Sequence, residues 1–370
     1  MSRMVQGWYS EVYTQEVNPD MDFTAGIQCP IPISDYPTIL LGHGGGGRLT
    51  QMLIDGMFVQ AFANPALEML HDGAVLDLPG PRLAFSTDSF VISPLFFPGG
   101  DIGSLAIYGT VNDLAMCGAQ PFGLSTALIL EEGLLMADLW RVVQSMQQAA
   151  HQVGVPIVTG DTKVVDRGKG DGIFINVTGI GLVPPDRMVS PRRAQPGDAI
   201  MINGSIAVHG IAIMSVREGL EFETTLESDS APLHTLVAQI LDTAGDHVHV
   251  LRDPTRGGLA SALNEIAAQA GVGIHLDETH IPLDEAVRGA CEILGLDPLY
   301  VANEGKCLVF VQADHAEAVL ETMRRHPLGR DAAIIGQVVA EHPGKVVIRS
   351  RIGGMRVVDM LSGEQLPRIC

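Results

Sequence analysis

Hydrophobic residues recur along the first half of the chain with two alternating periods. Runs rich in β-branched and aromatic residues predict strands at 82–92, 123–132, 155–165 and 172–183. Apolar positions spaced three and four residues apart predict helices at 49–62, 104–118 and 137–153. In the helix 104–118 we expect the core-facing positions to be Leu105, Ile107, Val111, Leu114 and Ala115. Strands alternating with helices indicate an α/β domain.

The second half repeats this mixture after a polar, proline-rich connector. Strands are predicted at 198–206, 273–278, 307–312 and 345–350, and helices at 209–218 and 253–271. We therefore predict a two-domain α/β protein. Its expected parts are an irregular extension (1–38), a first domain (39–184), a linker (185–196), a second domain (197–358) and a flexible tail (359–370).

Composition narrows the functional classes. The 370 residues are long enough for two cores, and 46% hydrophobic with 18% charged residues is typical of a globular protein. A formal net charge of −20 argues against binding nucleic acid or an anionic membrane. No uncharged run reads as a membrane span, no secretory signal is visible, and the five cysteines form no C-x-x-C pair. We expect a cytoplasmic protein with reduced thiols.

A glycine-rich stretch, "LLGHGGGGRLT" (40–50), is the first candidate binding element. Its glycines have the P-loop spacing, but Arg48 replaces the lysine and Leu49 the hydroxyl that binds magnesium. If its amides cover the phosphates of a nucleotide, other residues must hold the metal.

Three aspartates in the first domain are candidates for that role. Asp88 interrupts an apolar strand, Asp113 lies in an apolar helix, and Asp161 follows the apolar run "VPIVTG". Taken alone, each one is better explained as a capping or ion-paired residue. Together, after a glycine loop without a metal ligand, they predict a Mg²⁺ site, because Mg²⁺ takes carboxylate oxygens and shares phosphate oxygens.

Two stretches of the second domain carry further candidates. "DPTRGG" (253–258) places Asp253 and Arg256 at the start of a helix, where free amides attract anions; an N-cap with packing glycines is the alternative. "NEGK" (303–306) places Glu304 before a strand, and an ordinary turn is the alternative there.

The last residue of the sequence is a cysteine. In "LPRIC" the thiol of Cys370 lies beside a carboxylate, which disfavours the thiolate and suits a carrier better than a nucleophile. A fortuitous terminal cysteine is the alternative.

These stretches together resemble the HypE family of hydrogenase maturation proteins. The resemblance runs from about residue 42 to the end and includes "GHGGGGRLTQMLID", "GTVNDLAMCGAQP", "VTGDTKVVDRG", "DPTRGGLASALNE" and "LPRIC". It implies the aminoimidazole ribonucleotide synthetase-like fold, shared with selenophosphate synthetase. In that fold the N-terminal sheets of two subunits pair into a barrel, so the resemblance also implies a homodimer.

The resemblance also implies a reaction. A carbamoyltransferase of the HypF type loads Cys370, and ATP with Mg²⁺ drives dehydration of the carbamoyl group to a thiocyanate. The cyanide then passes to iron carried by a HypC–HypD complex. Alternatives are a small-molecule synthetase or kinase of the same superfamily and a non-catalytic maturation scaffold.

Site roles carried over from the matching motifs complete the prediction. The catalytic residues are Cys370, Glu304 and Lys163, the last two as candidate proton acceptors. The nucleotide-binding residues that the resemblance implies are His43, Gly44, Gly45, Gly46, Asn112, Asp161 and Arg256. Shaping the glycine loop is the alternative role for His43. The metal ligands are Asp88, Asp113 and Asp161. Where the family often has "HGSGG" and "GDHG", this chain has "HGGGG" and "AVHG" (207–210).

Overall fold

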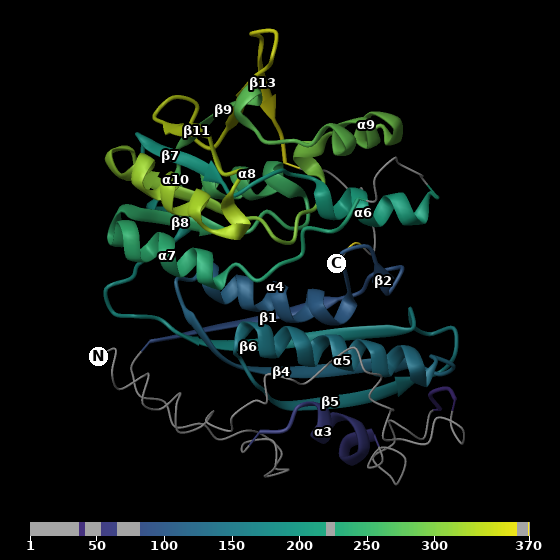
Figure 1. Cartoon of the computed structure of the whole chain (residues 1–370). Helices are drawn as coiled ribbons and strands as arrows, with labels where there is room; N and C mark the ends of the chain where they lie inside the picture. The colour runs from purple at the N-terminus through teal and green to yellow at the C-terminus, as the bar shows by residue number, and fades with distance from the viewer. Residues whose placement is uncertain (1–36, 41–52, 65–81, 220–225, 361–368, 370) are drawn as a thin grey trace.

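The structure is a computed structural model that describes residues 37–40, 53–64, 82–219, 226–360 and 369. Figure 1 shows two layered α/β units, one above the other, each built around its own sheet. The predicted two-domain α/β fold is confirmed.

The first domain is built on a four-stranded sheet. Its strands lie in the order β1 (Leu83–Phe90), β6 (Ile173–Leu182), β4 (Gln120–Glu131) and β5 (Ile157–Val165). Only β4 and β5 are parallel, since helix α5 (Met136–Val153) forms the crossover between them. Helices α4 (Ile102–Met116) and α5 pack together, and the short strands β2 (Phe96–Phe97) and β3 (Gly100–Asp101) precede α4.

Helix α4 lies between the first sheet and the second domain (Figure 1). It contacts β1 and β6 on one side and α7 (His234–Ala244) on the other. All five positions expected to face the core are at most 1% exposed, which confirms that prediction. The helix begins with a capping box, in which Asp101 accepts from the amides of Gly103 and Ser104. Because α4 contacts both domains, the polar residues on its second-domain side lie at the junction between the domains.

The second domain contains a seven-stranded, mostly antiparallel sheet. Its strand order is β13 (Met355–Val358), β12 (Val346–Arg349), β9 (Gly273–Asp277), β11 (Ala333–Val339), β7 (Asp198–Ile202), β10 (Leu308–Gln312) and β8 (Val248–Arg252). Its other helices are α6 (Val208–Arg217), α8 (Gly258–Ala270), α9 (Glu285–Leu294) and α10 (Ala316–Arg325).

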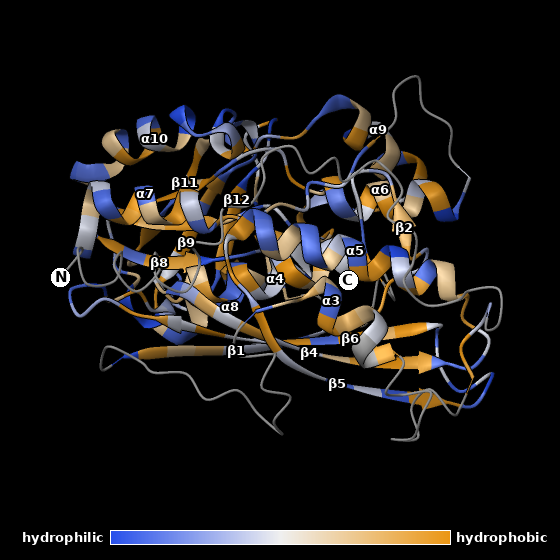
Figure 2. Cartoon of the chain, turned by 60° about the horizontal axis from the view of Figure 1, so that its bottom comes forward, coloured by the Kyte–Doolittle hydropathy of each residue, from blue (hydrophilic) through white to orange (hydrophobic). Residues whose placement is uncertain are grey.

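Helices cover both faces of this sheet. Along β10, Leu308 and Phe310 pack into the core with α6, α8 and α9, whereas Val309 and Val311 pack with α7 and α10. A strand that is buried on both faces is a continuous run of apolar residues, as β10 is. Figure 2 shows that hydrophobic residues dominate strands of both sheets. No helix in the described ranges is long and apolar enough to span a bilayer.

Several elements were not predicted from the sequence: β2, β3, β8, β11, β13, α7, α9 and α10. The predicted helix 49–62 corresponds in its described part to a π-helical turn, η2 (Ile54–Phe58), followed by α3 (Val59–Ala61). Ile39 is fully buried and its amide donates to the Leu134 carbonyl, so the first domain includes this segment. Residues 1–36 of the predicted extension lie outside the described residues.

Candidate functional site

Two of the predicted metal ligands lie near one another in the first domain. Side chains alternate along β1, so Asp88 lies on the inner face of the strand with the buried side chains of Ala84 and Phe90. Helix α4 packs on this face and brings Asp113, whose carboxylate accepts a 2.7 Å hydrogen bond from Ser86 Oγ. Asp88 and Asp113 repel each other, and this repulsion adds to the burial that raises the pKa of Asp113.

The second domain contributes two further carboxylates to the same place. Asp253 follows β8, and Glu304 precedes β10. Burial first, and then the charge of Asp113, raises the pKa of Asp253 to about 7. Burial and the neighbouring carboxylates, Asp253 among them, raise the pKa of Glu304 well above its ordinary value. Burial raises the pKa of Asp88, and the positive charge of the Arg256 guanidinium partly offsets this rise. Arg256 therefore lies close to these carboxylates.

We call these four residues, Asp88, Asp113, Asp253 and Glu304, the acidic cluster. Buried carboxylates that raise one another's pKa are stabilised when a cation lies among them. In the described part of the chain, no three His, Cys, Asp or Glu side chains form a complete metal cage. Mg²⁺ does not need one, because it takes one or two carboxylates and completes its shell with water and phosphate oxygens. The cluster therefore fits Mg²⁺ bound together with a phosphate-bearing substrate.

Asp161 and Lys163, in contrast, lie on the other face of the first sheet. Across the sheet, Asp161 is aligned with Ala127, Asn176 and Ser89. Ser89 is the residue next to Asp88 in β1, and adjacent residues of a strand point to opposite faces, so Asp161 and Asp88 lie on opposite faces. Both residues are exposed on β5, and two strands separate β5 from β1. Three strand spacings amount to about 14 Å. Within one chain, Asp161 and Lys163 are thus not brought to the acidic cluster.

Asn112 is at the junction between the domains. Its Nδ2 donates to the backbone oxygens of Ala231 at 3.0 Å and Glu304 at 3.2 Å, and its Oδ1 accepts from the amide of Leu233 at 2.7 Å. Every hydrogen-bonding position of this amide except one acceptor site is used by the second domain. In this arrangement Asn112 ties α4 to the loop that carries Glu304.

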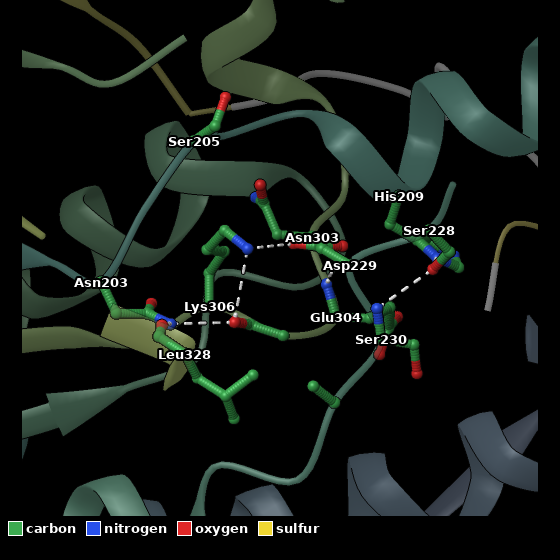
Figure 3. A network of polar contacts seen from close by, with 12 residues as sticks. Asn203, Ser205, His209, Ser228, Asp229, Ser230, Asn303, Glu304, Lys306 and Leu328 are labelled. Atoms are coloured by element: carbon green, nitrogen blue, oxygen red, sulfur yellow. Dashed lines mark hydrogen bonds and ion pairs between the residues drawn. The ribbon is translucent and has the colours of Figure 1, made fainter. Parts of the chain in front are cut away.

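The "NEGK" loop is bonded to the rest of the second domain from several sides. Asn303 Oδ1 accepts from the Ala207 amide at 2.7 Å, and its Nδ2 donates to the Pro254 carbonyl at 2.8 Å. Lys306 Nζ pairs with Asp229 at 2.8 Å, as the dashed lines in Figure 3 show. The lysine close to Glu304 in this chain is therefore Lys306. Neither Lys306 nor Asp229 was among the site residues predicted from the sequence.

The chain end returns to the same junction. The Ile369 side chain is 3% exposed within the first-domain core, and its backbone forms an antiparallel bridge with Ile92. Its carbonyl accepts a 2.7 Å hydrogen bond from Nε2 of His209 in α6. The sequence predicts a loose tail here, because one isoleucine among polar residues does not reveal a docking contact.

His209 was missed as a functional candidate. It is completely buried, and the edge of the Phe97 ring packs against it with ring centres 5.7 Å apart. The nearby negative charge of Asp229 opposes the desolvation that lowers the pKa of His209. In the sequence His209 stands in "AVHG", where the family often has "GDHG", and the histidine common to both was the available signal.

The remaining predicted site residues, His43, Gly44, Gly45, Gly46 and Cys370, lie outside the described residues. For these the assignments remain predictions.

The class of protein is that of the AIR synthase related proteins, whose two domain models both match this chain. The model of the AIR synthase related protein, N-terminal domain, matches residues 70–183, and that of the C-terminal domain matches residues 195–349. A protein of Cupriavidus necator named carbamoyl dehydratase HypE is 56% identical over 346 residues, covering 93% of this chain and 98% of its own length.

Solved structures agree with this assignment. A structure of hydrogenase maturation protein HypE in complex with ATP is 53% identical with a TM-score of 0.86, covering 90% of this chain and all of its own. HypE in a HypE–HypF complex is 47% identical with a TM-score of 0.74, covering 84% of this chain and 99% of its own. The chain belongs to the HypE family.

Proposed function

We propose that this chain catalyses the ATP-dependent dehydration of a carbamoyl group carried on Cys370 to a thiocyanate, the cyanide donor for the iron of NiFe hydrogenases. One observation carries this proposal: Ile369 is held at the domain junction by His209. The charge of the Asp229 carboxylate acts on the pKa of His209 and on that of Glu304, so both residues lie close to Asp229. The residue before the cysteine therefore lies near the acidic cluster. HypE relatives named carbamoyl dehydratase support the reaction class.

The chemistry requires a better leaving group than the amide oxygen. In the proposed reaction the carbamoyl oxygen attacks the γ-phosphorus of ATP and ADP leaves. The C–O bond then breaks, inorganic phosphate departs with that oxygen, and the carbon becomes the nitrile of S–C≡N. The nitrogen gives up both of its protons during this sequence, and phosphoryl transfer depends mainly on positioning and neutralised charge.

The residues of the junction suit these demands. Mg²⁺ held by Asp88 and Asp113 would neutralise phosphate charge. Arg256, which lies near Asp88, is the proposed contact to the same phosphates. Glu304 is the proposed proton acceptor, because a carboxylate whose pKa is raised binds a proton more strongly once it is ionised.

Lys163 and Asp161 fit the site only through a second copy of the chain. The sheet face that bears them also exposes Leu83, Phe85 and Ile129, which are 48%, 70% and 42% exposed. An apolar sheet face of this kind is suited to packing on another sheet. We infer a homodimer in which these faces meet, with Lys163 and Asp161 of one subunit completing the site of the other.

Two partners follow from the proposed reaction. A HypF-type carbamoyltransferase must load Cys370, and the HypE–HypF complex of a relative supports this step. A HypC–HypD complex is the proposed acceptor of the cyanide.

Intact-mass measurement tests the function. The chain is incubated with carbamoyl phosphate, ATP, Mg²⁺ and the carbamoyltransferase; we expect a carbamoyl adduct on Cys370 that then loses the mass of one water. An unmodified chain would favour a small-molecule kinase or synthetase, and an adduct that never dehydrates would favour a scaffold. Cys370→Ala should abolish both masses while ATP binding persists, and Asp88→Asn should stop only the dehydration.

A further inference from the structure

The contact between His209 and Ile369 involves a particular carbonyl. The oxygen that His209 Nε2 contacts at 2.7 Å belongs to the peptide unit that joins Ile369 to Cys370. By covalent geometry the Cα of Cys370 is about 3.8 Å from that of Ile369. Fixing this peptide unit therefore limits where the final thiol can lie.

The hydrogen-bond pattern determines the tautomer of His209. A carbonyl oxygen only accepts, so Nε2 must carry the proton that it donates to Ile369. Nδ1, 2.7 Å from Ser228 Oγ, then accepts from that hydroxyl in the neutral ring. Ser228 Oγ in turn accepts from the Ser230 amide at 3.1 Å (Figure 3). The chain of donors therefore runs from the Ser230 amide through Ser228 and His209 to the Ile369 carbonyl.

Ser228 is itself held by the first domain. Its amide donates to the Pro98 carbonyl at 2.8 Å, and a Cβ added at Gly99, where φ is +85°, would lie 2.7 Å from its backbone. Glycine is required at that position for both reasons. The hydroxyl that orients His209 is thus anchored across the domain junction.

We propose that His209, oriented by Ser228, is a positioning residue that holds the Ile369–Cys370 peptide unit and so docks the carrier thiol for dehydration. This inference rests on the proposed function for its catalytic consequence, but the docking itself does not. His209 favours the conformation in which Ile369 is docked at the domain junction.

Thiol accessibility tests the docking without any catalysis. The full-length protein is pulsed with iodoacetamide and the alkylated fraction of each cysteine peptide is measured by mass spectrometry. We expect His209→Leu, which has no donor, to raise the alkylation rate of Cys370 about fivefold, the effect of losing one net hydrogen bond. His209→Gln retains an N–H donor and should stay near the wild-type rate.

A matched control separates docking from general loosening. His249→Leu removes another buried histidine of the same domain, which bonds Asp198 at 2.9 Å and lies in β8 away from the tail. It should leave Cys370 alkylation unchanged. If His209→Leu leaves Cys370 alkylation unchanged, or raises alkylation of the buried Cys291 and Cys307 equally, the proposal is wrong.

The catalytic consequence is measured in a single turnover of the carbamoylated protein. We expect His209→Leu to slow dehydration, His209→Gln to restore it, and both to bind ATP as the wild type does. Equal loss in both variants would overturn the positioning role. Absence of dehydration in the wild type, with the alkylation results as expected, would refute the proposed function and leave the docking intact.

Discussion

Asn112 Nδ2, in the first domain, donates a hydrogen bond to the backbone oxygen of Glu304, in the second domain, at 3.2 Å. The residue next to a proposed metal ligand therefore fixes the loop that carries the proposed proton acceptor. This link makes the relative placement of the two domains part of the site.

We expect Asn112→Ala to destabilise the protein by about 2–4 kcal/mol, because two buried backbone groups and one partly buried backbone group lose their partner. Urea unfolding measures this directly. The sequence resemblance assigns Asn112 to the nucleotide instead. Unchanged stability together with weakened ATP binding would favour that assignment over the structural one.

Asp253→Asn should change how stability depends on pH. The pKa of Asp253 rises from 3.8 to about 7 on folding, so the folded state retains its proton when the unfolded state has lost it. The free energy of unfolding should therefore fall as the pH rises across that window, by at most about 4 kcal/mol.

Asp253→Asn removes this decline and should be more stable than the wild type at pH 8 without divalent cations. Urea midpoints between pH 5 and pH 8 provide the measurement, with the exposed Asp314→Asn as control. Parallel pH profiles for the wild type and Asp253→Asn would contradict the charge repulsion inferred for the acidic cluster.

Mixed dimers test whether Lys163 acts across subunits. Lys163→Ala and Glu304→Gln should each be inactive in dehydration alone. If the site combines Glu304 of one subunit with Lys163 of its partner, an equal mixture should recover roughly a quarter of wild-type activity, since half the dimers are mixed and each has one intact site.

A second mixture gives the opposite expectation. The double variant, carrying both substitutions, should reduce the activity of each wild-type chain it pairs with. Activity that is absent from the first mixture and undiminished in the second would place Lys163 and Glu304 in the same chain.

Gly305→Ala should disrupt the "NEGK" loop. A Cβ at Gly305 would lie 1.8 Å from the backbone oxygen of Asp229, so the loop and the partner of Lys306 cannot both stay in place. We expect loss of dehydration and a lowered melting temperature. Gly204→Ala is the control, because its Cβ would meet only Lys306 Cε at 3.6 Å, an ordinary contact; equal effects of the two substitutions would count against the steric argument.

The sequence determined the fold class and part of the site. Strand and helix periods in "RLAFSTDSFVI" and in the helix 104–118 are local properties, and so is the high cost of placing Asp88 and Asp113 in apolar elements. Their proximity followed once β1 and α4 packed together.

Only the tertiary structure decided which other groups join them. In the sheet register Asp161 is aligned with the neighbour of Asp88 and not with Asp88 itself, so the two carboxylates lie on opposite faces. No local sequence pattern encodes that register. His209 and Ile369 are 160 residues apart, and their contact exists because the domain junction brings α6 and the chain end together. Local periodicity specifies elements, whereas a site made of long-range contacts depends on how those elements pack.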